Sequence, residues 1–350
     1  MGWCGWAPLR GKVHAGEGSI IEQSATSSTE GRERDKAQEV PDKKEAPKDH
    51  IFVEGEYLDF EGYCGARPFV FLHHFSGEED RLGQAVKEES EKIGLKVTTY
   101  SADIEKGHDL TADKPYQSHH FGAYMADIDG YHSGFPCNTF TKLRWRPLAG
   151  HPGPLRSKSE PYHFKTLSPE KKAECGKGTI LMARSVDMVK AMERGHQDMV
   201  VKGFATLENP PPSDHPQHIS AWHMPELVQL VDGLPQWESA HFHACAYQSD
   251  REVGTRHFKP QLVGGTLPGL ESLTRSCPCG NAPHEPIVGK ERSARSAAYP
   301  MEFCRAYGRL AALHFHRVAK AEFLEGRREE IAKNIANRKK VLRRLEEGRV

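Results

Sequence analysis

The sequence has no dense cysteine framework, no long apolar run and no secretory leader. Its 8 cysteines are scattered over 350 residues, unlike the closely spaced sets of disulfide-stabilised secreted domains. No stretch reaches the length of about 18 apolar residues that a membrane span needs. The first residues lack the basic region and the apolar run of a signal peptide. These absences predict reduced thiols in an intracellular protein that has no membrane partner.

The sequence also lacks an excess of either charge. Its 48 Lys and Arg residues balance 48 Asp and Glu residues, so no global basic field predicts binding to nucleic acid. The only clearly basic segment begins at Met301, where 13 Lys and Arg face 7 Asp and Glu, a difference of +6. One interpretation is a solvated helix with i,i+4 ion pairs; the other is contact with nucleic acid or a protein partner.

Aromatic residues are almost absent between Gly16 and His50, where Ser, Thr, Glu, Lys and Asp dominate. Such a composition cannot bury enough apolar surface to offset the entropy of the chain. We therefore expect residues 1–50 to form a disordered leader, residues 51–313 to form the folded domain, and residues 314–350 to form a basic helical tail.

The folded part alternates buried strands with amphipathic helices. Residues 69–72 form a continuous apolar run that opens into a turn, and the next apolar positions recur at helical spacing up to Gly94. Further strands are expected at 95–100, 130–134, 201–207 and 241–246, and helices at 179–194, 225–231 and from Pro300, with an irregular excursion at 150–178. This alternation predicts an α/β fold with a mostly parallel, doubly wound sheet and C-terminal helices.

Residues suited to catalysis follow two of the predicted strands. Cys137 lies in the run Phe135-Pro-Cys-Asn-Thr-Phe-Thr141, with Arg144 close behind, and Leu207-Glu-Asn-Pro210 follows about 70 residues later. With Phe75-Ser-Gly77, Asp103 and Asp109-Leu110, these ordered motifs resemble those of the C5-cytosine methyltransferase superfamily. They are more closely similar to the divergent methyltransferase-like domains found within retroelement polyproteins. The resemblance covers residues 68–313.

The resemblance implies a class I, Rossmann-like methyltransferase fold that binds S-adenosylmethionine. Phe75, Ser76 and Gly77 would lie against the methionine moiety of the cofactor, Asp103 would accept the ribose hydroxyls, and Asp109 would contact the adenine amine. DNA, or alternatively RNA, would be the substrate or ligand, and a nuclear location is expected if the substrate is DNA. For Asp103 and Asp109, the competing interpretation is local turn formation.

The chemistry of cytosine methylation accounts for the residue types. Carbon C5 is a poor nucleophile until a thiolate adds at C6, which would be the role of Cys137. Glu208, as a buried acid with a raised pKa, would hydrogen-bond to N3. Arg144 would hold the base or a phosphate oxygen, and the base would have to be flipped out of its stack. The competing interpretations are a buried small hydrophobe at Cys137 and a loop cap at Glu208.

Several departures from the family pattern predict relaxed or lost catalysis. The expected Gly-x-Gly after the first strand is replaced by Glu78-Glu-Asp80, whose carboxylates would repel that of the cofactor, and Phe135 replaces a proline. The alternative function is therefore a non-catalytic module that binds nucleic acid or protein and retains the fold. The run Asn209-Pro-Pro-Pro212 also invites comparison with methyltransferases that act on exocyclic amines, but it lacks their stacking aromatic residue.

A second group of candidate residues could hold a metal. Cys277, Cys279 and His284, with Cys245 as a further candidate, offer the soft ligands that tetrahedral zinc prefers. Their spacing is not a common zinc pattern, and an ordinary turn with two thiols is the competing interpretation. A zinc-stabilised interaction domain is accordingly a third possible function.

Overall fold

The computed structural model describes residues 67–145, 152–249, 251, 255–285, 287 and 296–346. All of them belong to the unit Leu58–Val350, and the predicted leader lies outside them. Within these described ranges, no helix combines the length and the apolar character that a bilayer crossing requires.

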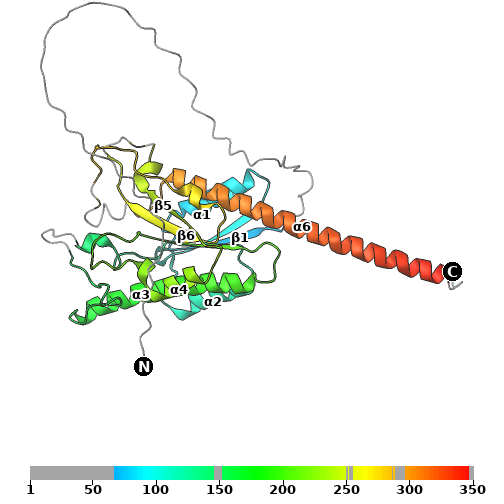
Figure 1. The fold of residues 1–350 in the computed structure, drawn as a ribbon, viewed down its shortest axis with the longest axis horizontal. Helices are drawn as coiled ribbons and strands as arrows, with labels where there is room; N and C mark the ends of the chain where they lie inside the picture. Colours follow the sequence, from blue (N-terminus) through cyan, green and yellow to red (C-terminus); the bar gives the residue numbers. More distant parts are fainter. Residues whose placement is uncertain are drawn as a thin grey trace, which may run out of the picture. The chain divides into compact units, whose positions relative to one another are not determined.

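Six strands form one mixed sheet in the order β2-β1-β3-β4-β6-β5 (Figure 1). The neighbours β1 to β4 pair in parallel, whereas β6 is antiparallel to both β4 and β5, so that β5 again runs with the others. The predicted α/β class is confirmed, and the sheet is mixed, with β1 to β4 parallel and both pairings of β6 antiparallel. The reversed strand β6 was not predicted, because an apolar run does not encode its direction. The bounds are β1 (Phe69–His74), β2 (Val97–Ala102), β3 (Gly130–Ser133), β4 (Phe204–Asn209), β5 (Glu238–His243) and β6 (Pro260–Gly265).

Helices cover both faces of the sheet (Figure 1). On one face lie α1 (Arg81–Glu91) and α6 (Met301–Glu346). On the other lie α2 (Asp113–Tyr124), α3 (Pro169–Gly195) and α4 (Pro225–Asp232). Helices on both faces explain why the central strands read as continuous apolar runs.

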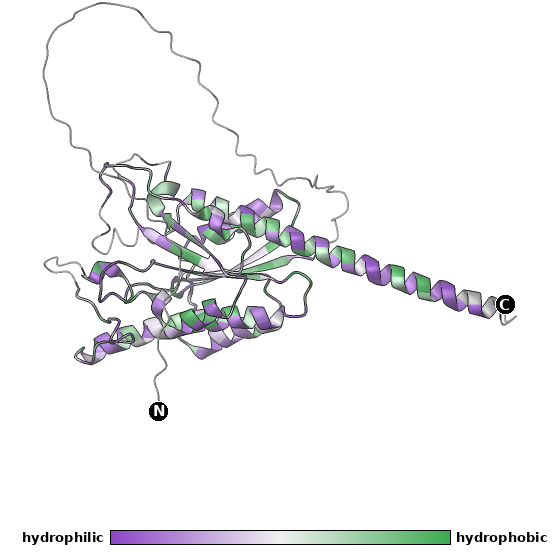
Figure 2. Cartoon of the chain, viewed as in Figure 1, coloured by the Kyte–Doolittle hydropathy of each residue, from purple (hydrophilic) through white to green (hydrophobic). Residues whose placement is uncertain are grey.

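Two hydrophobic cores follow from the alternation of side chains along the strands. Phe69 and Phe71 of β1 pack with the α1 and α6 side, whereas Leu72 packs with the α3 side. Burial of each such side chain contributes about 1.5–3 kcal/mol. Figure 2 shows apolar residues concentrated in the strands and in the helices that flank them. The two cores hold the sheet between its two layers of helices.

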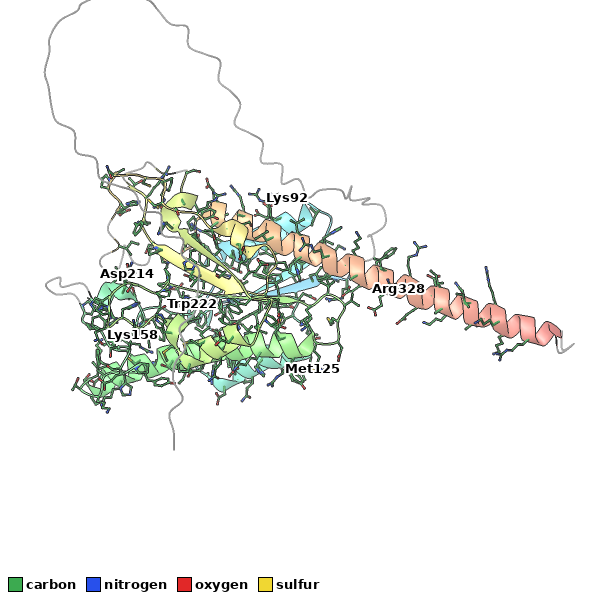
Figure 3. The ribbon with its side chains drawn as sticks, in the orientation of Figure 1. Lys92, Met125, Lys158, Asp214, Trp222 and Arg328 are labelled. Atoms are coloured by element: carbon green, nitrogen blue, oxygen red, sulfur yellow. The ribbon has the colours of Figure 1, made fainter. Side chains whose placement is uncertain are left out.

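Helix α6 runs without interruption across the boundary predicted at residue 313. Its buried positions extend to Ala319, and all residues from Glu322 to Lys340 are exposed. Gly308 allows its close approach to α1, because a Cβ there would come within 2.7 Å of the main-chain oxygen of Ala85. Arg328 lies on the exposed part of the helix, beyond the sheet (Figure 3).

The prediction of an irregular segment at 150–178 is wrong for its last ten residues, which form the start of α3. Ser168 caps this helix by accepting from the Lys171 amide, and Pro169 occupies its first turn. Gly178 inside the helix provides room for a neighbouring loop, since a Cβ there would lie 2.8 Å from Oγ1 of Thr139. Gly178 therefore serves packing rather than chain irregularity.

Candidate functional site

The candidate site lies where the adjacent parallel strands β3 and β4 end. Their register pairs Ser133 with Leu207, which places Gly134 beside Glu208. A Cβ at Gly134 would come within 3.4 Å of Oε2 of Glu208. In addition, Nδ2 of Asn209 donates a 2.9 Å hydrogen bond to the main-chain oxygen of Phe135. The structure thus joins the Pro-Cys segment directly to the Glu-Asn segment.

The carboxyl group of Glu208 is buried and held from two sides. Gln261 of β6 donates from Nε2 to Oε1 at 3.1 Å, and the hydroxyl of Tyr299 donates to Oε2 at 3.1 Å. Burial raises the pKa of Glu208, while nearby Lys259 and the two hydrogen bonds act in the opposite direction. The residue therefore keeps its proton to a higher pH than an exposed glutamate does.

A chain of hydrogen bonds lies behind Tyr299. Nε2 of His132 is 3.0 Å from the Tyr299 hydroxyl, and Nδ1 of His132 is 2.8 Å from Oγ1 of Thr206. Oγ1 of Thr206 is in turn 2.6 Å from the Tyr307 hydroxyl. Because Tyr299 donates to Glu208, its oxygen accepts from His132, which assigns the His132 proton to Nε2. Burial lowers the pKa of His132 well below its usual value, which favours this neutral form.

Cys137 is half-buried in the loop that follows β3. Burial raises the pKa of its thiol; the charge of Lys259 favours the thiolate, and that of Glu208 opposes it. These opposite effects place Cys137, Glu208 and Lys259 within electrostatic reach of one another. The Lys259 ammonium also donates to the main-chain oxygen of Ser296 at 3.0 Å.

Lys259 and Tyr299 were missed as site residues by sequence reasoning. Lys259 immediately precedes β6, the strand whose presence and direction were not predicted, and Tyr299 immediately precedes the Pro300 that leads into α6. No local apolar or helical pattern in the sequence marks either residue as part of the site.

Of the residues expected to contact a cofactor, Phe75, Ser76, Gly77 and Asp103 lie directly after β1 and β2. Phe75 and Gly77 have positive φ angles of 61° and 66°, so the chain turns sharply after β1. Oδ2 of Asp103 accepts from the Gly77 amide at 2.9 Å, and Oδ1 accepts from the Glu105 amide at 3.0 Å. A Cβ at Gly77 would meet nothing within 4 Å. The turn is therefore open beside the Asp103 carboxylate.

Asp80, in the stretch Glu78-Glu-Asp80 after β1, is held by local hydrogen bonds. It is buried at a positive φ of 43°, accepts from the Gly83 amide at 3.0 Å and lies 2.6 Å from Nδ1 of His73. It also accepts from the hydroxyl of Ser101. Burial opposes the charge, but these hydrogen bonds outweigh burial and lower the pKa of Asp80.

Asp109 and Arg144 are both held in local contacts. Asp109 is exposed, and its Oδ1 accepts from the amide and the hydroxyl of Thr111 at 2.8 and 2.6 Å, which forms a turn. Arg144 donates to the oxygens of Asn138 and Gly153 and to Oε1 of Glu174, at 2.5, 3.3 and 2.7 Å. The structure therefore gives each residue a structural contact, and the functional role predicted for each stays a prediction.

Two further features bear on where the site lies. Trp222, labelled in Figure 3, donates from Nε1 to the main-chain oxygen of Asn209 at 3.2 Å and so supports the end of β4. A surface cavity of about 500 Å³ lies at the opposite edge of the sheet, lined by Lys202, Gly203, Trp237 and Glu238. The four cavity residues lie before or at the start of β4 and β5, whereas Cys137 and Glu208 lie at the carboxyl ends of β3 and β4. The candidate site is therefore assigned to Cys137 and Glu208, because the cavity lining contains no cysteine.

The metal-ligand candidates also lie together. The ligand atoms of Cys245, Cys277, Cys279 and His284 are all within 4.8 Å of one another. Cys245, which the sequence left as a further candidate, therefore completes a set of four.

The chain was compared with protein-family models, with curated proteins and with solved structures, and none of the three comparisons found a match.

Proposed function

We propose that this chain is an S-adenosylmethionine-dependent methyltransferase-like protein that acts on cytosine C5 in DNA through Cys137. One observation carries the proposal. The cysteine-bearing loop after β3 and the glutamate at the end of β4 are adjacent, and the hydrogen bond between Asn209 and Phe135 joins them. A thiol and a buried carboxylic acid at neighbouring strand ends are the two groups that activation of a pyrimidine ring requires.

The strand order supports a cofactor site next to these residues. The chain passes from β1 to β2 on one side and then to β3 on the other, so the order reverses between β1 and β3. Open α/β sheets bind ligands at the carboxyl ends of the strands at such a reversal.

The residues at this position fit the cofactor in part. The open turn at Gly77 gives backbone access, and the half-buried carboxylate of Asp103 retains acceptor capacity for ribose hydroxyls. The Asp80 carboxylate is occupied by contacts with His73, the Ser101 hydroxyl and the Gly83 amide, which reduces the repulsion that a free carboxylate would exert on the cofactor. When bound, S-adenosylmethionine supplies a methyl group that leaves a sulfonium with neither of its bonding electrons.

The chemistry assigned to the chain's own residues balances. The Cys137 thiolate forms a bond to C6, and the C5–C6 π electrons move towards N3 and become available at C5. The neutral carboxyl of Glu208 donates to N3, which stabilises the added negative charge. After C5 has gained its methyl group, water takes up the C5 proton, the electron pair of the C5–H bond forms the C5–C6 double bond, and the S–C6 bond breaks with its electrons on sulfur, which restores the Cys137 thiolate. Lys259 favours the thiolate at the first step.

A methyl-transfer assay tests the proposal. Purified native chain is incubated with cytosine-containing duplex and single-stranded DNA and with S-adenosylmethionine labelled in its methyl group. We expect label in the DNA, recovered as 5-methylcytosine, and a loss of at least about a hundredfold for Cys137→Ser. Cys175→Ser is the matched control, because Cys175 lies in α3 away from Glu208. Native chain that binds the cofactor but never labels any DNA would contradict the proposed reaction.

One set of observations favours a second function, a non-catalytic nucleic-acid-binding module. Asp80 occupies a glycine-rich stretch of the family pattern, Arg144 is held in loop contacts, and burial raises the pKa of Cys137. The exposed stretch of α6 would then supply the contact surface through residues such as Arg327, Arg328 and Lys333. Calorimetric titration with S-adenosylhomocysteine separates the two, because the module predicts DNA binding without cofactor binding.

A further inference from the structure

We propose that Cys245, Cys277, Cys279 and His284 bind one structural zinc ion. Cys245 lies in a short 3₁₀ helix directly after β5, and the other three residues lie in the loop that follows Leu273. Their sulfur and imidazole nitrogen atoms lie within 4.8 Å of one another. Three thiolates and one histidine complete a four-coordinate shell that leaves no position for water, which is the character of a structural site.

The spacing fits a tetrahedral zinc after a small contraction. Zinc bonds of about 2.3 Å to sulfur and about 2.0 Å to nitrogen give separations of about 3.8 Å between sulfurs and about 3.6 Å between sulfur and nitrogen. Sγ of Cys277 and Nε2 of His284 are already 3.3 Å apart. Because no separation exceeds 4.8 Å, the movement that is required is at most about 1 Å. Rotation of a side chain of the half-buried Cys279 or His284 is sufficient for this movement.

Hydrogen bonds to the end of β5 place Cys277 close to Cys245. Residues 275–277 run beside the end of β5, where the Arg275 amide donates to the oxygen of His241 at 3.1 Å. The His243 amide donates to the oxygen of Arg275 at 3.0 Å, and the Cys277 amide donates to Nδ1 of His243 at 2.9 Å. Cys277 therefore reaches the point at which β5 passes into the segment that carries Cys245.

A tight turn then brings the remaining ligands back. Gly280 has a positive φ of 57°, and the Ala282 amide donates to the oxygen of Cys279 at 3.0 Å. The Cys279 amide also points at Sγ of Cys277 at 3.5 Å. A disulfide between two of the cysteines would leave the third thiol and His284 beside it without a role, whereas one zinc ion uses all four groups.

The zinc site would fix the position of Lys259, a consequence that rests on the proposed function. The His284 ring lies 5.3 Å from the ring of Phe258, and the Ala244 amide donates to the oxygen of Lys259 at 3.0 Å. The segments that carry His284 and Cys245 thus contact Lys259 and its neighbour. Loss of the metal would loosen the ammonium group that acts on Cys137 and Glu208.

Metal analysis of the full chain tests the site. We expect about one zinc ion per chain after purification from medium that contains zinc, and less than about a tenth of that for Cys277→Ser. Cys137→Ser is the matched control and should retain its zinc. Because Cys277→Ser could fail to fold, Cys279→His provides a second variant, and its two cysteines and two histidines should still hold zinc. Cobalt in place of zinc should show the intense visible bands of a tetrahedral thiolate complex.

Three results would overturn the zinc site. They are native chain that lacks zinc and has all three thiols freely reactive, a disulfide between two of these cysteines, and zinc that persists in folded Cys277→Ser. The test is independent of the methyl-transfer proposal. Zinc-loaded native chain without methyl transfer contradicts only the enzyme, and active native chain without zinc contradicts only the metal site.

Discussion

Asn209 Nδ2 donates a 2.9 Å hydrogen bond to the main-chain oxygen of Phe135, and through this bond the end of β4 holds the loop that carries Cys137. Both groups are buried. Asn209→Ala would leave the Phe135 oxygen without its donor, which costs about 1–3 kcal/mol of unfolding free energy. Chemical denaturation measures this loss. Asn138→Ala, at an exposed position of the same loop, should change stability by less than about 0.5 kcal/mol.

Tyr299→Phe tests the support of the Glu208 carboxyl. The Tyr299 hydroxyl lowers the pKa of Glu208, against the larger effect of burial. Its removal should therefore raise that pKa further and shift the acid form of the site to higher pH. Infrared titration of the protonated carboxyl band measures the shift. The band is assigned to Glu208 by its absence in Glu208→Gln. Tyr307→Phe is the control, because Tyr307 contacts Thr206 and not Glu208; an equal shift in both variants would contradict the assigned network.

The pH dependence of the free energy of unfolding should show the effect of the buried histidines. Burial lowers the pKa of His74 and of His132 well below the usual value, and neighbouring histidines add to the effect. Below about pH 6.5 the unfolded chain therefore takes up protons that the folded chain refuses. Stability contributed by each histidine is complete above that pH and falls by up to about 1.4 kcal/mol per pH unit below it.

Glu208 acts in the opposite direction and can be separated from the histidines. Because burial raises its pKa, its contribution to stability falls as the pH rises above the unfolded value of about 4.3. Native chain and Glu208→Gln are denatured at several pH values. Because the variant lacks the contribution of Glu208, the slope of its unfolding free energy against pH reports the histidines. A flat profile between pH 7 and pH 5 in Glu208→Gln would contradict neutral, buried His74 and His132.

Two glycines of α6 should respond oppositely to alanine. In Gly308→Ala the new methyl group would lie 2.7 Å from the Ala85 oxygen, so α6 and α1 must separate, at a cost of about 1–3 kcal/mol. Gly326 is exposed, and a Cβ there meets nothing within 4 Å. Gly326→Ala should therefore stabilise the helix by about 0.5–1 kcal/mol. Thermal unfolding of both variants measures the difference, and equal effects would contradict the α1–α6 packing.

The parts of the fold that the sequence predicted are those with strong local signals. The strand at 69–72 and the helix that begins at Pro225 are confirmed, because apolar runs and proline positions are short-range features. Helix α2 was missed because Ala123 is its one buried residue and it shows no clear apolar stripe. Lys259 and Tyr299 reach the site only through long-range packing of β6 and α6, which no local pattern encodes.

Covalent trapping on DNA tests the central claim most directly, namely that Cys137 is a nucleophile towards the pyrimidine ring. Native chain is incubated with S-adenosylmethionine and DNA that contains 5-fluorocytosine, in which the C5 substituent cannot leave as a proton. We predict a stable complex whose mass equals chain plus methylated DNA, with the attachment mapped by peptide sequencing to Cys137 and absent in Cys137→Ala. A chain that binds the cofactor and the DNA yet forms no adduct, or an adduct on another cysteine, would contradict the account.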